Sequence, residues 1–202
     1  MSRPHGDARH PHDHPRTDRA AGHGLPERHR PARPEPEALL ARVQDAITAV
    51  RAVGGTIGHV RVAFTLDDWE AVPDRNMSFS AVAAAKAMHH EDATAQIHEA
   101  IAPRDEDIVV RKIRYGATST RGLHEQLADR GIHTLILTGI STSGVVLSTL
   151  MDVADRDYSV YVLSDGVADR DPEVHRVLLD KEFPTRAHVI DTAGLHALLQ
   201  AA

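Results

Sequence analysis

After Pro36 the spacing of apolar residues changes repeatedly, and these changes divide the chain into elements. Leucine, valine and isoleucine recur at helical spacing over residues 36–53, and Gly54 and Gly55 then end the pattern. Residues 56–64 (TIGHVRVAF) have the composition of a strand. The first regular part of the chain is therefore predicted to be a helix followed by a strand.

The alternation of helix and strand continues to the C-terminus. Residues 133–138 (HTLILT) are almost continuously apolar, which predicts a strand covered on both faces. Asp171 is placed to cap a helix that has Pro172 at its first position. Strands separated by helices predict an α/β fold with a doubly wound parallel sheet. The remaining expected elements are a loop over 65–78, a helix over 79–88, a strand over 108–111, a helix over 120–130, a turn over 139–144, a helix over 143–156, a strand over 159–163, a loop over 164–171, a strand over 188–190 and a helix from 193.

Three segments follow the carboxyl ends of predicted strands. Lys112 follows the strand 108–111, the turn GISTSG (139–144) follows the strand 133–138, and SDGVAD (164–169) follows the strand 159–163. Ligands of doubly wound sheets bind outside the carboxyl ends of the strands. We therefore expect these segments to share one rim that carries the functional site.

Lys112 and the turn 139–144 are the strongest candidates on this rim. Lys112 can orient a carboxylate or lower the pKa of a neighbouring acid, and a solvated loop lysine is an equally good interpretation. The amides at the start of the helix after the turn can cradle an anion or an oxyanion. Thr142 is interpreted first as the N-cap of that helix. A serine nucleophile is a weak proposal, because the chain has no GxSxG motif.

Other polar residues near the rim have simpler interpretations. Asp165 and Asp169 can form a carboxylate pair, but ordering the loop and capping the next helix is favoured. His175 is interpreted as a helix-surface residue with no acid placed beside it. Trp69 either covers the site or packs in an ordinary way.

Residues 1–35 differ in composition from the rest. They are rich in proline, histidine and arginine, and Met1 and Leu25 are their only large aliphatic residues. We predict a disordered segment over 1–35 and a folded domain over 36–202. The tail is interpreted as solvated, and a function in metal or nucleic-acid binding, testable by deleting it, is a less favoured alternative. The tail histidines that suggest this alternative are His5, His10, His12 and His14.

Composition and charge exclude several classes of function. The chain has 23 Lys plus Arg, 29 Asp plus Glu and a net charge of −6, which predicts no general attraction to nucleic acid or to a membrane surface. It has no cysteine, so disulfides and thiol nucleophiles are excluded. No apolar run approaches the roughly 18–20 residues that span a bilayer. We expect a cytoplasmic protein.

The stretch LILTGISTSGVVLSTLMDVADRDYSVYVLSDGVADRDPEVHRVL resembles the isochorismatase-like hydrolase superfamily, also called the cysteine hydrolases. The superfamily includes nicotinamidases, carbamoylsarcosine amidases and isochorismatases. The resemblance runs from about Pro36 to the C-terminus and is most specific over 133–178. It implies a Rossmann-type, three-layer α/β/α fold.

The resemblance also implies roles for individual residues. Members combine an aspartate that ends the first strand, a lysine that ends a later one, and a cysteine after the motif G-[IV]-x-T-x-x-C. The lysine falls on Lys112 and the cysteine position falls on Val145. The oxyanion amides fall on Ser141 and Val145, Ile140 and Thr142 complete the substrate-binding turn, and the Ile140–Ser141 peptide bond is expected to be cis.

Two departures from the family pattern concern the chemistry. Val145 has no nucleophilic atom, so the thiol mechanism cannot operate. Some vinyl-ether-cleaving isochorismatases also lack the cysteine and use the aspartate as a general acid. Here the expected apolar strand ending in an aspartate is absent before residue 36. No apolar run precedes the acidic residues of that region, Asp7, Asp13 and Asp18, and none of them is assigned the role.

The absent strand also affects folding. In the family order this strand is central, and its loss leaves buried backbone groups unpaired at ~1–3 kcal/mol each, against a domain stability of ~5–15 kcal/mol. Either another segment fills the position or the sequence does not represent an intact protein. Residues 1–35 have the composition of GC-rich DNA translated in the wrong frame, a hypothesis that translation of the other frames tests.

The predicted function is hydrolysis of a vinyl ether or C–N bond in a small molecule, with chemistry impaired in the chain as translated. The alternative is a non-catalytic homologue that binds a small molecule or pairs with another subunit, so whether the chain is an enzyme stays open. We expect a homo-oligomer without a cofactor. A nicotinamidase-type metal site is not expected, because Asp67 and Asp68 have no histidine near them in the sequence.

Overall fold

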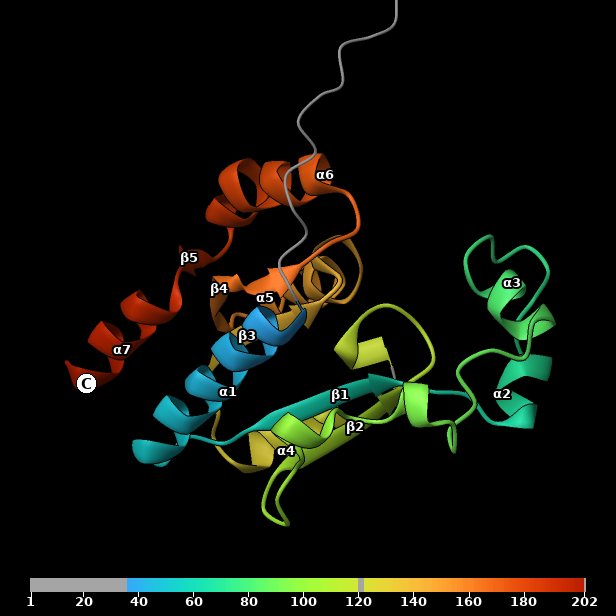
Figure 1. The fold of residues 1–202 in the computed structure, drawn as a ribbon, viewed down its shortest axis with the longest axis horizontal. Coiled ribbons are helices and arrows are strands. Elements are labelled where there is room, and N and C mark those ends of the chain that lie inside the picture. Colours follow the sequence, from blue (N-terminus) through green and yellow to red (C-terminus); the bar gives the residue numbers. More distant parts are fainter. Residues whose placement is uncertain (1–35, 120–121, 202) are drawn as a thin grey trace, which may run out of the picture. The chain divides into compact units, whose positions relative to one another are not determined.

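The computed structural model describes residues 36–119 and 122–201, so the predictions made for residues 1–35 lie outside it. Figure 1 shows the arrangement of the helices and strands. In chain order they are α1 (Pro36–Ala52), β1 (Gly58–Val62), α2 (Leu66–Glu70), α3 (Phe79–Ala84), the 3-10 turns η1 (Ala93–Ala95) and η2 (Glu99–Ile101), β2 (Ile108–Lys112), the 3-10 turn η3 (Ala117–Ser119), α4 (Leu123–Asp129), β3 (Thr134–Ile140), the π-helical turn η4 (Thr142–Val146), α5 (Leu147–Ala154), β4 (Ser159–Ala168), α6 (Pro172–Val177), the π-helical turn η5 (Leu178–Glu182), the 3-10 turn η6 (Phe183–Thr185), β5 (His188–Ile190) and α7 (Thr192–Gln200).

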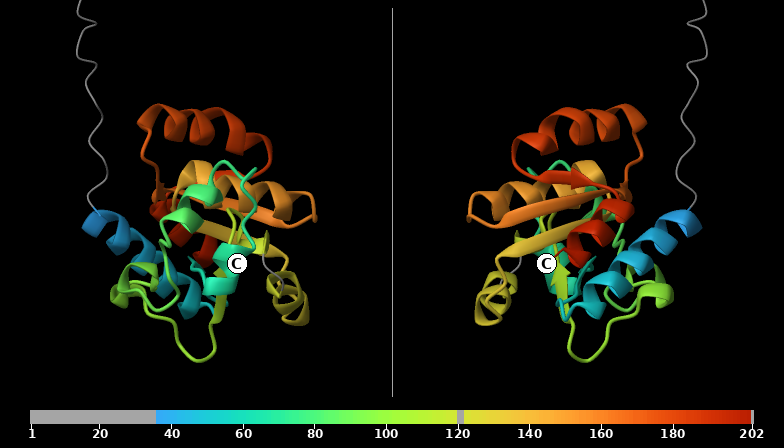
Figure 2. Two further views of the ribbon diagram at one scale, coloured as in Figure 1. Left: turned by 90° about the vertical axis from the view of Figure 1, so that its right-hand side faces the viewer. Right: turned by 90° about the vertical axis from the view of Figure 1, so that its left-hand side faces the viewer.

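The strands form two sheets, and every pairing is parallel. The first sheet has the order β1-β2 and the second has the order β3-β4-β5. Val62 at the end of β1 is in register with Lys112 at the end of β2. Figure 2 shows β3 (yellow) and β4 (orange) running side by side. The parallel α/β fold predicted from the sequence is confirmed.

β1, β2, β3 and β5 each have one edge without a paired strand in the part of the chain that the structure describes. The central first strand that the family resemblance implies is not among the described strands, so the division into two sheets does not contradict the prediction made for it.

Helices cover both faces of the second sheet. Val162 of β4 lies in a core cluster with Leu150 of α5, whereas the next residue, Leu163, packs with Ala46 of α1 and Leu195 of α7. Successive side chains of a strand point to opposite faces, so α5 covers one face of β4 while α1 and α7 cover the other. This is the three-layer arrangement that the resemblance implies.

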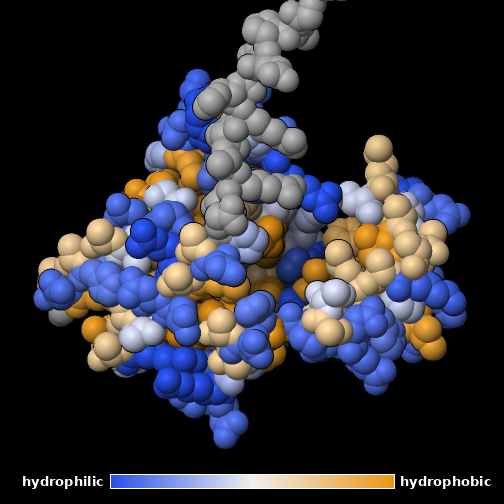
Figure 3. Space-filling model, in the orientation of Figure 1, coloured by the Kyte–Doolittle hydropathy of each residue, from blue (hydrophilic) through white to orange (hydrophobic). Residues whose placement is uncertain are grey.

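The strand predicted in 133–138 is covered on both faces, as expected, but its side chains are only partly buried. Leu135, Ile136 and Leu137 of β3 are half-buried, although they pack on the cores of both faces. The physical reason is that β3 pairs only with β4, so its other edge leaves part of each side chain uncovered by described residues. Figure 3 shows apolar atoms (orange) exposed among polar ones on the face seen in Figure 1.

Several boundaries differ from the sequence prediction. The predicted loop over 164–171 is strand as far as Ala168, because Val167 pairs with Gly139 after a shift in register. The predicted loop over 65–78 contains α2, which begins with a capping box formed by Thr65 and Asp68. The helix predicted over 79–88 ends at Ala84. The helix predicted over 143–156 begins as the π-helical turn η4.

Two elements after Asp171 match their predictions. The side chain of Asp171 accepts hydrogen bonds from the amides of Glu173 and Val174, and Pro172 opens α6 as expected. β5 has its predicted bounds.

Within residues 36–119 and 122–201, no helix combines the length and the apolar character needed to cross a bilayer.

Candidate functional site

Lys112 is the last residue of β2, and its side chain is buried, with 6% of the residue exposed. Its Nζ donates hydrogen bonds to the carbonyl oxygens of Arg114 at 2.8 Å and Tyr115 at 2.7 Å. The turn after β2 therefore folds back over the ammonium group. Of the two interpretations left open by the sequence, the solvated loop lysine is wrong.

Burial also changes the acidity of Lys112. Removal from water disfavours the charged form and lowers the pKa of the ammonium from 10.5 to about 8. No carboxylate of the described residues lies within 4.0 Å of Nζ, since Lys112 takes part in none of their ion pairs. At neutral pH the group is a buried cation held by carbonyl dipoles alone, and it can donate a proton more readily than an exposed lysine.

The turn after β3 supplies the second part of the site. The Ile140–Ser141 peptide bond is cis, as the resemblance implies. The N-cap of η4 is Ser141, which makes no side-chain cap hydrogen bond, so the prediction that Thr142 caps this helix is wrong. A Cβ on Gly144 would lie 2.5 Å from the Ser141 Oγ, and this contact explains why the turn has a glycine there.

The side chain of Asp169 contacts the start of the turn η4. One carboxylate oxygen, Oδ2, accepts hydrogen bonds from the amide and the hydroxyl of Ser143, both at 2.7 Å. Burial acts to raise the pKa of Asp169, but the hydrogen bonds from Ser143, Arg170 and Asp171 outweigh it and lower the pKa below its usual value. The Ser143 amide is therefore already engaged, and an anion at this turn has to use other donors.

Thr142 and His175 form a pair that the sequence analysis did not find. Thr142 is completely buried, and its Oγ1 lies 2.8 Å from Nδ1 of His175 on α6. His175 is half-buried and ties α6 to the turn, so the prediction that it is only a helix-surface residue is wrong. The two residues are far apart in the sequence, and no local pattern indicates their contact.

Val145 lies in η4 at the position of the family cysteine, and its half-buried side chain packs against the core between the second sheet and α5. It offers hydrocarbon where the family mechanism needs a thiolate.

Asp165, on the same rim, accepts hydrogen bonds from the Thr192 amide and hydroxyl. It joins β4 to α7 and is engaged there, so no pair with Asp169 is formed.

The residues of α2 have structural roles. Asp68 forms an ion pair with Arg111 and accepts a hydrogen bond from the Thr65 amide. Trp69 is buried and donates its ring N–H to the carbonyl oxygen of Ala87. Ordinary packing is therefore the better of the two interpretations of Trp69.

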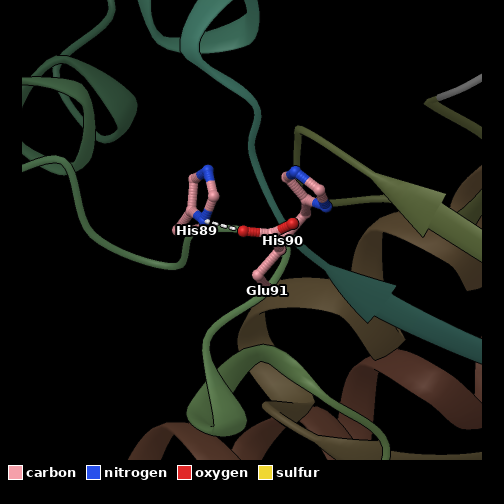
Figure 4. A group of neighbouring side chains, drawn as sticks. All are labelled: His89, His90 and Glu91. Atoms are coloured by element: carbon pink, nitrogen blue, oxygen red, sulfur yellow. Dashed lines mark ion pairs between the residues drawn. The ribbon is translucent and has the colours of Figure 1, made fainter.

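A group of possible metal ligands lies in the loop after α3, and the sequence analysis overlooked it. His89, His90 and Glu91 each offer a ligand atom, and these atoms lie within 4.8 Å of one another. Figure 4 shows the Glu91 carboxylate lying between the two imidazole rings. The His89 ring lies 5.5 Å from the Trp69 ring, measured between centroids. Histidines are therefore close to α2 in space, contrary to the expectation from the sequence.

One surface pocket, of about 280 Å³, lies between α1 and η2, and another, of about 360 Å³, lies against α2 and α3. Neither of these two pockets is lined by Lys112 or by residues 140–145.

Comparison with known sequences gives consistent matches. A family model described as "Isochorismatase domain" matches residues 23–194. The chain is 31% identical over 178 residues to a protein named ureidoacrylate amidohydrolase RutB from Methylobacterium radiotolerans, covering 80% of this chain and 67% of that protein. It is 30% identical over 150 residues to a protein of the same name from Methylorubrum extorquens, covering 66% of this chain and 58% of that protein. The chain thus spans less than two thirds of the second relative.

Three solved structures have a similar fold. An isochorismatase family protein from Burkholderia thailandensis has a TM-score of 0.70 and 25% identity, covering 81% of this chain and 84% of that chain. A cysteine hydrolase from Pseudomonas syringae has a TM-score of 0.74 and 22% identity, covering 84% and 83%. An N-carbamoylsarcosine amidase from Thermoplasma acidophilum has a TM-score of 0.63 and 23% identity, covering 80% and 86%.

Proposed function

This chain belongs to the isochorismatase family, and on that premise we propose that it acts on a small molecule at the rim formed by Lys112 and the turn 140–145, with hydrolysis of a vinyl ether or C–N bond as its reaction. The buried ammonium of Lys112 supports the proposal most directly. A lysine is seldom buried without a charged partner, and a strongly perturbed group at the carboxyl end of a strand is a candidate functional group.

Each part of the rim has a role in the proposal. The Lys112 ammonium, with its pKa lowered to about 8, donates a hydrogen bond or a proton to the substrate atom that becomes negative. The amides of Ser141 and Val145 stabilise an oxyanion, while Ile140 and Thr142 shape the turn. With Val145 at the family cysteine position and no cysteine in the chain, a covalent thioester intermediate cannot form, and the proposed hydrolysis uses direct attack by water.

The carboxylate is the part that the described residues do not supply. Water attack needs a general base, and protonation of a vinyl ether needs a general acid, and Lys112 alone cannot perform both roles. This is why the proposal includes impaired turnover for the chain as translated. A carboxylate beside Lys112 would raise the lysine pKa and restore the acid–base pair.

A second candidate is a non-catalytic protein that keeps the binding rim. It is favoured by one observation, the hydrocarbon side chain of Val145 at the position where the family has its nucleophile. In this case the chain binds the small molecule, or pairs with another subunit, without turnover. In both candidates the protein is a cytoplasmic homo-oligomer without a cofactor. Light scattering of the purified protein would measure the mass of the oligomer.

The names of the similar proteins guide the choice of test substrates. Ureidoacrylate and N-carbamoylsarcosine present a C–N bond, and isochorismate presents a vinyl ether. The full chain is incubated with each compound, and both product formation and heat of binding are recorded for the wild type, for Lys112→Ala and for Lys181→Ala. Lys181 is exposed and serves as the matched control.

The outcomes separate the candidates. Turnover that falls at least about 100-fold in Lys112→Ala and is kept in Lys181→Ala supports the hydrolase. Binding that depends on Lys112 without any product supports the second candidate. Turnover that is equal in all three proteins contradicts the assignment of the site. Circular dichroism of each variant confirms that the fold is retained.

A further inference from the structure

The loop that follows α3 holds two histidines in a fixed backbone position at the end of the first sheet. The His90 amide donates to the carbonyl oxygen of Phe64 at 2.9 Å, and the Phe64 amide donates to the carbonyl oxygen of Met88. The His90 carbonyl oxygen accepts hydrogen bonds from the Arg61 guanidinium at 3.2 Å and from the Gln96 amide group at 2.7 Å. The loop is thus tied to the chain that continues from β1.

The imidazole rings of His89 and His90 are held by aromatic packing, but their nitrogens make no hydrogen bond to the described residues. The His89 ring is tilted against the Trp69 ring, and the two imidazole rings have centroids 4.6 Å apart. Within residues 36–119 and 122–201, no hydrogen bond occupies a ring nitrogen of His89 or His90. The nearest charged group is Glu91, whose Oε2 lies 4.0 Å from Nδ1 of His89. This distance is too long for a hydrogen bond.

A movement of the side chains would bring these donor atoms to one metal ion. Zinc binds histidine nitrogen at about 2.0–2.1 Å and carboxylate oxygen at about 2.0–2.2 Å, so two ligand atoms of a tetrahedral ion lie about 3.4 Å apart. The three donor atoms lie within 4.8 Å of one another, and side-chain rotations that shorten their separations by up to about 1.4 Å bring all of them into range. Glu91 is exposed and free to make this adjustment.

We propose that His89, His90 and Glu91 bind a divalent transition-metal ion of the zinc class. Two imidazoles and one carboxylate suit zinc, cobalt and nickel rather than magnesium or calcium, which prefer oxygen ligands. Three protein ligands leave at least one coordination position open to water or to a ligand. Asp67 and Asp68 are not part of this donor set, since the group comprises only the three consecutive residues and Asp68 is paired with Arg111.

The site lies near the rim but is independent of the proposed function. Phe64, which bridges to His89, is next to Ala63, whose amide donates to the Lys112 carbonyl oxygen at 3.1 Å. A metal ion there would lie beside the carboxyl ends of β1 and β2. The prediction of no metal site made from the sequence rested on the residues around Asp67, and the loop after α3 supplies the histidines from further along the chain.

Zinc binding to the full-length chain tests the proposal. The histidines of the N-terminal segment would also offer ligand atoms to added zinc, so all measurements use a background variant in which His5, His10, His12 and His14 are replaced by serine. We expect one zinc ion per chain by titration calorimetry and an increase in Tm of about 5–10 °C at saturating zinc. His89→Ala, His90→Ala and Glu91→Gln should each weaken binding at least about 10-fold.

His133→Ala is the matched control, because His133 is exposed and lies outside the group. This variant should bind zinc as the background protein does. Cobalt provides an independent measurement, since its visible spectrum reports nitrogen ligands and a coordination number below six. The proposal is overturned if the background protein binds no zinc, or if zinc affinity is the same in the three ligand variants and in His133→Ala. Metal-free Tm values identify any variant that fails to fold.

Discussion

The second sheet completely buries apolar side chains in the middle of its central strand, whereas the first sheet leaves some apolar side chains exposed. Val162 and Leu163 of β4 are 0% exposed, while Val60 of β1 is 36% exposed and Val109 of β2 is 47% exposed. β4 has a paired strand at each edge and helices on both faces, but β1 pairs only with β2 in the described part of the chain. β2 also pairs on one edge only, yet its Ile108 and Val110 are 1% and 5% exposed, so burial in the first sheet alternates with the face on which a side chain lies.

The same difference runs through the functional site. Lys112 belongs to the first sheet, whereas Ser141 and Val145 follow a strand of the second. The first strand that the family resemblance implies is also the strand that carries the family aspartate. Neither that strand nor a carboxylate partner of Lys112 is among the described residues.

The largest expected loss of stability comes from a substitution in the core of the second sheet. Leu163→Ala removes a completely buried side chain and should lower the free energy of unfolding by about 2–5 kcal/mol. Val109→Ala, at an exposed position of the first sheet, should change it by less than about 0.5 kcal/mol. Urea unfolding of both variants measures the contrast. Equal losses would contradict the difference in burial between the sheets.

Supplying a strand should reduce the difference between the sheets. A segment of about six residues, rich in valine and isoleucine and ending in aspartate, replaces residues 1–35. Pairing with β1 and β3 should raise the free energy of unfolding by about 3 kcal/mol and slow amide exchange in β3. A segment with a central proline is the control and should have neither effect. No slowing of exchange in β3 would show that its open edge does not accept a strand.

The pH dependence of stability should reveal the cost of burying Lys112. Its folded pKa of about 8 lies below the unfolded value of 10.5, so the unfolded chain binds more protons between these values and the free energy of unfolding rises with pH there. The rise amounts to about 3 kcal/mol in total. Lys112→Met should lack it. Unfolding measured from pH 7 to 10.5 provides the test, and parallel curves would contradict a lowered pKa.

A smaller effect is expected at the turn of the second sheet. Asp169 has a lowered pKa, so its hydrogen bonds to Ser143 stabilise the fold above the usual pKa of an aspartate and are lost as pH falls through the lower, folded value. Asp169→Asn should cost about 1–2 kcal/mol at pH 7 and almost nothing at a pH acidic enough to protonate Asp169 in the folded protein. Thermal unfolding of the wild type and of Asp169→Asn at both pH values measures this difference in stability. A loss of stability that is the same at both pH values would contradict a charge-assisted hydrogen bond.

Most of the fold could be predicted because its elements have local signals. The helical spacing in 36–53, the glycines that follow it, and Asp171 with Pro172 each act within a few residues of their own position. The strand continuation to Ala168 was missed because Asp165 and Gly166 are poor strand formers. Pairing with β3, a distant part of the chain, overrides that local preference.

The site was less predictable because its contacts join distant residues. The pair of Thr142 and His175 and the bonds from Asp165 to Thr192 connect different elements, and no spacing in the sequence indicates them. Lys112 was found from its place after a strand, but its burial was not, because the carbonyls of Arg114 and Tyr115 turn back in a way that the sequence does not show.

The pKa of Lys112 tests the central claim most directly. The lysines of this chain are Lys86, Lys112 and Lys181, so a sample labelled with ¹³C at lysine Cε gives a simple NMR spectrum, and Lys112→Met assigns the signal. A buried ammonium without a carboxylate beside it should titrate at about 8. A midpoint at or above the ordinary value of 10.5 would reveal a negative partner at this amine and contradict the account.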